Sequence, residues 1–177
     1  MNNPSAKQWL TQAKSDLACA ERCLIPGDAA TYCHAIAKYQ QAVEKAIKAL
    51  VVALNLMEPT RDHEVTEELK ELGQFSLNPR GKANKAYAKE VKRLFDRGGN
   101  RPRIRELVQL SPKYPAAGAM ARRNTEYPFQ NVAGEWKIPA DAEIFSTEEL
   151  NQFRQITGLV IKSAGEIAVA RQLKITA

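Results

Sequence analysis

Two adjacent arginines and a nearby tyrosine are the side chains in this sequence that best suit phosphate chemistry. They lie in the stretch MARRNTEYPFQN as Arg122, Arg123 and Tyr127, with Asn124 between them. An arginine presents a planar fork of N–H donors that matches phosphate oxygens, and a phenol ring offers a face on which a base can stack. The stretch has no histidine to move a proton near neutral pH. It therefore predicts phosphate binding and argues against catalysis.

The same stretch also has a purely structural interpretation. Arg122 and Arg123 could cap the C-terminus of a helix, while Tyr127, Pro128 and Phe129 could pack against the end of a helical bundle. The sequence alone does not separate this interpretation from phosphate binding.

The positive charge of the chain is concentrated in one segment. The 177 residues carry a formal net charge of +6. From Arg80 to Arg105, ten Lys or Arg residues face only Glu90 and Asp96, so this segment carries +8 and the remaining 151 residues sum to −2. Such a local excess attracts polyanions, and phosphate binding would weaken with salt because it releases condensed counterions. The arginines expected to assist phosphate binding are Arg97, Arg101, Arg103 and Arg105. The alternative is a solvated insertion whose charges only keep it soluble.

Helical periodicity runs through most of the chain, and no segment shows convincing strand alternation. Helices are predicted over residues 5–24, 29–55, 64–72, 83–95, 102–110 and from 146 to about 173. Pro26 and Gly27 should end the first helix, Asp28 should cap the second, and Gly73 should end the third. These patterns predict an all-α, antiparallel up-and-down bundle, with four main helices and shorter ones in the basic segment.

The last helix has the clearest start signal. Ser146 and Glu149 are spaced as a capping box, and Phe145 and Leu150 as a hydrophobic staple. At this length, one domain over residues 1–177 is expected, with a basic insertion at about 78–110. The longest apolar run, residues 49–57, is too short to cross a bilayer, and the N-terminus lacks a signal-peptide pattern, so a cytoplasmic protein with no membrane partner is expected.

Cysteines and histidines give no strong metal signal. Cys19, Cys23 and Cys33 are odd in number and fall within helical patterns, which favours reduced thiols in the core. Cys19 and Cys23 could share a metal with His34, but no fourth ligand is evident. We therefore predict neither a metal site nor a cofactor.

His63 is the one weak catalytic candidate. It precedes a predicted helix, where a histidine is more often a surface or capping residue. If it met Arg123 in space, the pair would form an acid/base device.

Lysines also recur at helical spacing on the second predicted helix. Lys45 and Lys48 follow His34, Lys38 and Gln41 in one row, which could line a phosphate-binding cleft. A solvated helix face is the favoured interpretation, and Lys45 and Lys48 are retained as auxiliary basic residues.

The helical segments together resemble the HEPN domains, named for higher eukaryotes and prokaryotes and often encoded beside a minimal nucleotidyltransferase. The similarity rests on WLTQAKSDLACAERCL, YCHAIAKYQQAVEKAIKALVVALN, DHEVTEEL, ARRNTEYPF and FSTEELNQFRQITGLVIKSAGEIAVARQL, and covers roughly residues 6–174. The resemblance implies an antiparallel helical bundle that commonly dimerises, with a cleft near the dimer axis.

Many HEPN domains look like metal-independent ribonucleases with an arginine followed four to six residues later by a histidine. That motif would make Arg122 or Arg123 the phosphate-binding arginine and would place the histidine between residues 127 and 130. The chain instead has Tyr127, Pro128, Phe129 and Gln130 there. An unperturbed phenol, with a pKa of about 10, is a poor base near neutral pH, so this departure puts ribonuclease activity in doubt.

Three functional hypotheses follow. The first is a non-catalytic nucleotide- or RNA-phosphate-binding protein that works as a homodimer or as the HEPN half of a toxin–antitoxin-like pair with a minimal nucleotidyltransferase. The second is a ribonuclease toxin that uses His63 as its base. The third is a structural dimerisation or interaction bundle whose last helix makes the contact.

Overall fold

The computed structural model describes residues 4–60, 63, 65–79, 81–110, 123–131 and 133–175. The described helices are α1 (Ala6–Cys23), α2 (Tyr32–Leu54), α3 (Thr66–Leu77), α4 (Lys82–Asp96), α5 (Asn100–Gln109) and α6 (Thr147–Ile175), with 3₁₀ turns at Ala29–Thr31 and Arg97–Gly99. Strands β1 (Phe129–Gln130) and β2 (Trp136–Lys137) form a short antiparallel hairpin. The predicted all-α bundle is confirmed.

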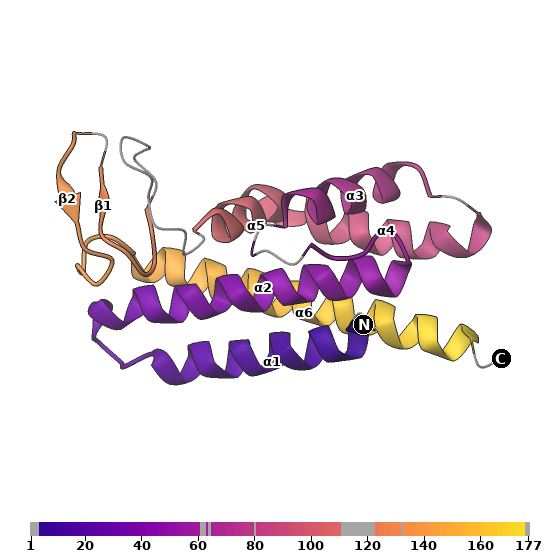
Figure 1. Ribbon diagram of the computed structural model, residues 1–177, viewed down its shortest axis with the longest axis horizontal. Helices are drawn as coiled ribbons and strands as arrows, with labels where there is room; N and C mark the ends of the chain where they lie inside the picture. Colours follow the sequence, from indigo (N-terminus) through magenta and orange to yellow (C-terminus); the bar gives the residue numbers. More distant parts are fainter. Residues whose placement is uncertain are drawn as a thin grey trace.

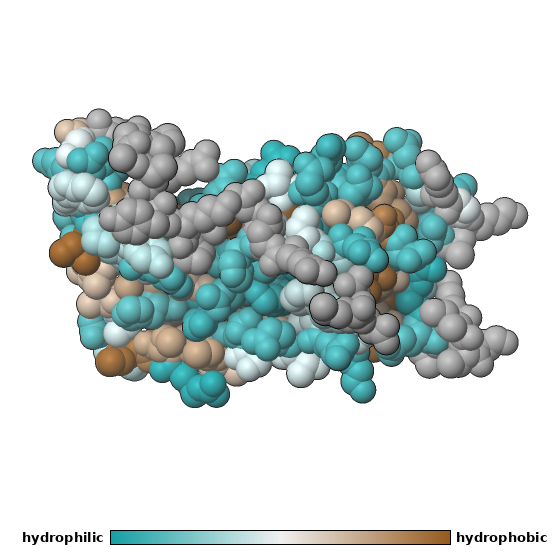
Figure 2. Space-filling view, in the orientation of Figure 1, coloured by the Kyte–Doolittle hydropathy of each residue, from teal (hydrophilic) through white to brown (hydrophobic). Residues whose placement is uncertain are grey.

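The helices form two groups that pack against each other (Figure 1). Helix α1 runs antiparallel to α2, and α6 packs along both of them. Helices α3 and α5 pack against α2, and α4 and α5 pack against α6. The hairpin lies at the end where α6 begins. On the face shown in Figure 2, the visible residues are mostly hydrophilic. None of the described helices combines the length and the apolarity that crossing a membrane requires.

The first two helices begin and end close to the predicted residues. Ser5 and Gln8 form a capping box at the start of α1, which satisfies backbone N–H groups that have no partner within the helix. The side chain of Asp28 accepts a hydrogen bond from the backbone N–H of Ala30 (3.0 Å), so it caps the turn that leads into α2. At the end of α2, Asn55 adopts a left-handed conformation with φ 54°.

Helix α2 is the centre of the core. Its fully buried apolar side chains include Ile36, Val43, Ile47 and Leu50. Tyr39 is also buried, and its hydroxyl donates to Glu21 Oε1 on α1 (2.8 Å). Glu21 in turn accepts from Arg154 of α6. Burial and the neighbouring Glu21 carboxylate raise the pKa of Tyr39 above its ordinary value, so the phenol stays protonated and donates to Glu21. The contacts of Glu21 with Tyr39 and Arg154 connect three helices.

Helix α3 is longer than expected. Gly73 was predicted to end it, but the helix continues to Leu77 and Gly73 lies inside it. Leu72 and Phe75 are buried on either side of the glycine. Their burial outweighs the roughly 1 kcal/mol that a glycine costs within a helix, so the prediction was wrong at this residue.

The basic segment is built into the same core as α2. Tyr87 and Val91 on α4, and Ile104 and Leu107 on α5, belong to the same cluster of buried apolar side chains. The turn between the two helices contains Gly98 and Gly99 at φ 59° and 76°, a conformation that glycine adopts without strain. The helical predictions for this segment are confirmed. Its status as an insertion remains a prediction.

The start of α6 confirms the predicted capping box. The backbone N–H of Ser146 donates to Glu149 Oε2 (3.0 Å), and the backbone N–H of Glu149 donates to Ser146 Oγ (3.1 Å). Phe145 and Leu150 are both buried. The hairpin before this helix was not predicted, because strands of two residues are too short to show an alternating pattern.

Candidate phosphate-binding site

Arg123 lies between α5 and the start of α6, with its guanidinium held on both sides. Nη1 donates to the backbone oxygen of Ile144 (3.1 Å) and to Glu149 Oε1 (2.5 Å), and Nη2 donates to Glu106 Oε1 (3.0 Å). The guanidinium carbon stands 5.2 Å from the centre of the Phe145 ring. These contacts fix the direction in which the arginine presents its donors.

Glu149 links the Arg123 contact to the capping box. Partial burial would raise its pKa, but hydrogen bonds from Ser146 and from Arg123, together with the charge of Arg123, hold the pKa below the ordinary value. Glu149 is therefore ionised near neutral pH, and it anchors Arg123 to the first turn of α6.

A cavity of about 500 Å³ opens beside Arg123. It is lined by residues of α5 and by Arg123 itself: Arg101, Pro102, Arg105, Glu106, Gln109, Leu110 and Arg123. The structure thus brings Arg123 together with two of the four auxiliary arginines, Arg101 and Arg105. Arg97 and Arg103 do not line this cavity.

The cavity wall carries an excess of positive charge. Arg105 is exposed and makes no hydrogen bond or ion pair with any residue that the structure describes. Arg101 lies 5.4 Å from the Phe95 ring centre, and its Nη2 is 3.4 Å from Asp96 Oδ1. Among the described residues, three guanidinium groups and one carboxylate, that of Glu106, line the space. Such a wall suits an anionic group that can accept several N–H donors.

The other residues of the arginine stretch have different surroundings. Asn124 is buried, and its Oδ1 accepts from the backbone N–H groups of Glu126 (2.8 Å) and Tyr127 (3.0 Å), which shapes the turn after Arg123. Tyr127 is 36% exposed and does not line the cavity. Arg122 lies outside the described residues. Phosphate contacts from these three residues remain predictions.

The interpretation of this stretch as a helix cap with packed aromatic side chains agrees with the structure only in part. Phe129 is buried, as that interpretation expected. Within the described residues, Arg123 contacts the beginning of α6 and a side chain of α5, and none of its hydrogen bonds goes to a carbonyl at the C-terminus of a helix.

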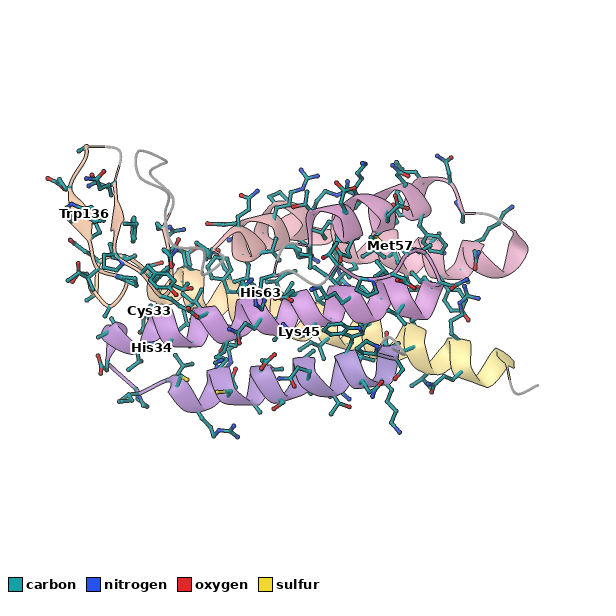
Figure 3. The ribbon with its side chains drawn as sticks, viewed as in Figure 1. Cys33, His34, Lys45, Met57, His63 and Trp136 are labelled. Atoms are coloured by element: carbon teal, nitrogen blue, oxygen red, sulfur yellow. The ribbon has the colours of Figure 1, made fainter. Side chains whose placement is uncertain are left out.

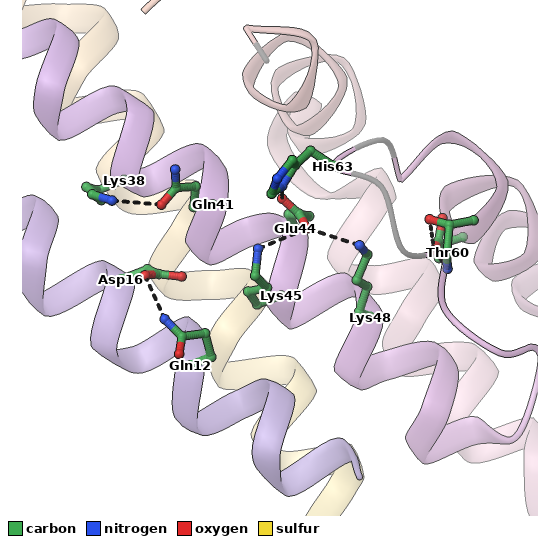
Figure 4. Close-up of polar contacts among 10 residues, drawn as sticks. Gln12, Asp16, Lys38, Gln41, Glu44, Lys45, Lys48, Thr60 and His63 are labelled. Atoms are coloured by element: carbon green, nitrogen blue, oxygen red, sulfur yellow. Dashed lines mark hydrogen bonds and ion pairs between the residues drawn. The ribbon is translucent and has the colours of Figure 1, made fainter. Parts of the chain in front are cut away.

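A second charged cluster lies on α2, facing the segment before α3 (Figures 3 and 4). Glu44 Oε1 accepts from Lys45 Nζ (2.9 Å) and Lys48 Nζ (3.0 Å), and Glu44 Oε2 is 3.1 Å from His63 Nδ1. The side chain of Lys48 is only 1% exposed, and its Nζ lies 5.4 Å from the centre of the Trp9 ring. The interpretation of this row as a solvated helix face is therefore wrong for Lys48, because α1 packs against that part of α2.

Glu44 balances the charges of this cluster. Burial alone would raise its pKa, but Lys45, Lys48 and the hydrogen bond to His63 together bring the pKa below the ordinary value. His63 itself is 61% exposed at its side chain. A carboxylate on one ring nitrogen fixes the orientation of an imidazole and leaves the other nitrogen for solvent or a ligand. His63 is not among the residues that line the cavity beside Arg123.

Sequence reasoning missed two carboxylates of the site. Glu106 and Glu149 both bind Arg123, although they are 17 and 26 residues away from it in sequence. The capping-box pattern identified Glu149, but only as a helix cap, and no local pattern marks Glu106. In the described part of the chain, no group of three or more His, Cys, Asp or Glu side chains is placed to hold a metal ion.

A family model described as "HEPN domain" matches residues 6–110 of the chain. The match spans α1 to α5 and includes Arg101, Arg105 and Glu106, whereas Arg123 and α6 follow it. No curated protein and no solved structure was found to match the chain.

Proposed function

Because the chain belongs to the HEPN domain family, whose functions relate to nucleotides and RNA, we propose that it binds a phosphate-bearing ligand, a nucleotide or an RNA segment, in the cavity beside Arg123. One observation carries the proposal. Arg101 and Arg105 of the basic segment line the same cavity of about 500 Å³ as Arg123 of the arginine stretch, which follows Arg105 by 18 residues.

The chemistry of the lining residues supports binding without cleavage. The guanidinium groups can donate to phosphate oxygens and neutralise their charge. Cleavage of RNA through its own 2′-hydroxyl also needs a group that takes up a proton near neutral pH, and the cavity lining includes no histidine. The positions where the family's ribonuclease motif would place one hold Tyr127, Pro128, Phe129 and Gln130.

The family also suggests partners. HEPN domains commonly dimerise and bind nucleotides. We propose that this chain acts in the cytoplasm as a homodimer or together with a minimal nucleotidyltransferase, as the HEPN half of a toxin–antitoxin-like pair. Co-purification of the chain with a nucleotidyltransferase encoded beside it would test the pairing.

Substituting Arg105 tests the binding site. Arg105→Ala is expected to weaken binding of single-stranded RNA or a nucleotide by about tenfold, because a charge-assisted hydrogen bond contributes roughly 1.5–3 kcal/mol. The substitution should leave the free energy of unfolding nearly unchanged, since Arg105 makes no hydrogen bond or ion pair with a described residue. Fluorescence anisotropy with labelled ligands, at several salt concentrations, measures both the affinity and its salt dependence.

Arg93→Ala provides the matched control for this experiment. Arg93 is an exposed arginine on α4 that pairs with Glu90 and does not line the cavity. Equal losses in the two variants would indicate non-specific attraction and contradict the proposed site. The interaction-bundle hypothesis instead expects no binding of either ligand, and association with a partner protein that does not weaken with salt, because apolar interfaces release few counterions.

The hydrogen bond between Glu44 and His63 favours a second candidate, a metal-independent ribonuclease that uses His63 as its base. Under this hypothesis, the protein cleaves end-labelled RNA in excess chelator, and His63→Ala lowers the cleavage rate by about 100-fold or more. Our proposal instead expects intact RNA with both proteins on a denaturing gel. If the wild type cleaves RNA and the variant does not, while the helical circular dichroism is unchanged, binding without cleavage is contradicted and the ribonuclease hypothesis is supported.

The interaction-bundle hypothesis has support on α6. Leu159 and Val169 are exposed on this helix, and Gly158 and Gly165 have no neighbour within 4 Å of an added Cβ. Another helix could therefore approach this face closely. The salt dependence described above separates such a contact from a phosphate complex.

A further inference from the structure

The two carboxylates that bind Arg123 differ in how firmly they are held. Glu149 also accepts hydrogen bonds from the backbone N–H and the hydroxyl of Ser146, so it is fixed to the start of α6. Glu106 has Arg123 as its one hydrogen-bond partner among the described residues. The side chain of Glu106 is 42% exposed, against 29% for Glu149, and only Glu106 lines the cavity.

We propose that Glu106 is an exchangeable internal counter-ion, which occupies Nη2 of Arg123 until a terminal phosphate group displaces it. This inference rests on the proposed function of the cavity. Nη1 stays bound to Glu149 and to the backbone oxygen of Ile144. The guanidinium thus keeps its orientation while its Nη2 edge changes partner.

The energetics of the exchange favour a phosphate. A partly exposed ion pair such as Glu106 with Arg123 contributes only about 0.2–1 kcal/mol, so releasing it costs little. A phosphate that enters the cavity can accept from Arg123 and from Arg105, which has no described partner. Two charge-assisted hydrogen bonds then replace one.

The charge balance points to a phosphate at the end of a ligand. The incoming group has to replace the single negative charge of Glu106 and also neutralise Arg105. A terminal phosphate carries up to two negative charges, whereas a phosphodiester inside an RNA strand carries one. The terminal phosphate of a mononucleotide and the phosphorylated end of an RNA share this chemistry, and the experiment has to distinguish them.

Removing the charge of Glu106 tests the inference. Glu106→Gln is expected to bind ligands with a terminal phosphate about three- to fivefold more tightly than the wild type, because the competing carboxylate is gone. Isothermal titration calorimetry would compare ADP, a short RNA with a phosphate at one end, and the same RNA ending in a hydroxyl. Tighter binding of ADP or of the phosphorylated RNA identifies the source of the phosphate.

Two further variants serve as controls. Glu166→Gln, on the exposed face of α6, changes the net charge equally without contacting Arg123. It should leave the affinity unchanged, and an equal gain in this variant would overturn the inference. Glu106→Ala should reproduce the gain of Glu106→Gln, which excludes an effect peculiar to the glutamine amide.

Failure of the inference differs from failure of the proposed function. If Glu106→Gln binds no more tightly than the wild type while Arg105→Ala still loses affinity, Glu106 is no counter-ion and the cavity remains the site. If neither the wild type nor Glu106→Gln binds any of the probes, both proposals fall. Equal gains for the phosphate-ended and hydroxyl-ended RNA would overturn the terminal-phosphate specificity.

Discussion

Replacing Glu44 with glutamine is expected to lower the free energy of unfolding by about 3–5 kcal/mol, because it removes the carboxylate from a buried ion pair. The side chain of Lys48 is 1% exposed, and its ammonium group lies 3.0 Å from Glu44 Oε1. Without that carboxylate, its positive charge stays in a region that solvent barely reaches. Urea unfolding followed by circular dichroism measures the loss.

A double variant separates the lost charge balance from lost packing. Glu44→Leu combined with Lys48→Met replaces both charges by apolar side chains, and it should recover most of the stability that Glu44→Gln loses. Glu67→Gln on the exposed face of α3 should change the free energy of unfolding by less than about 0.5 kcal/mol. A similarly small effect of Glu44→Gln would contradict the assignment of a structural ion pair.

The stability contributed by Glu44 should depend on pH. Its pKa is lower in the folded protein than its ordinary value, so its contribution is fully present above the pKa of the unfolded chain, about 4.3. The contribution is lost as the pH falls through the folded pKa. The stability difference between the wild type and Glu44→Gln should therefore shrink in acid and remain constant from mildly acidic to neutral pH.

Arg123→Ala is expected to lose both stability and phosphate affinity. The free energy of unfolding should fall by about 1–3 kcal/mol, because hydrogen bonds to two carboxylates and one backbone oxygen are removed. The affinity for a phosphate ligand should fall by about tenfold or more, since the cavity loses a charged donor. Urea unfolding and fluorescence anisotropy on the same preparation provide the two values.

The comparison with Arg105→Ala makes this prediction specific. Arg105 has no described partner, so its loss should weaken binding without weakening the fold, whereas Arg123 is required for both. An Arg123→Ala protein that is less stable but binds phosphate like the wild type would show that Arg123 serves only to connect α5 and α6.

The helical architecture was predictable because its signals are local. The capping box of Ser146 and Glu149 and the apolar periodicity of α2 each lie within a few turns of one helix. The end of α3 was mispredicted because a distant core holds Leu72 and Phe75 in place around Gly73. Local propensity is overridden where tertiary burial contributes more free energy.

The candidate site was predictable only in part. The concentration of charge identified Arg101 and Arg105, and the family motif identified Arg123. The three arginines line one cavity because α5 packs near the start of α6. No short sequence pattern predicts that packing. The role of Glu106 is hidden for the same reason, because a carboxylate at an exposed helix position is ordinary until its partner is known.

The most direct test of phosphate binding in the cavity is a nuclear magnetic resonance titration that observes isotope-labelled arginine side chains as ADP or RNA is added. Binding in the cavity predicts that the Nε signals of Arg105 and Arg123 shift with saturation, whereas those of Arg93 and Arg154, which do not line the cavity, stay in place. Variants at each arginine assign the signals. Shifts confined to other arginines, or none at ligand concentrations that saturate binding, would contradict the cavity as the phosphate site.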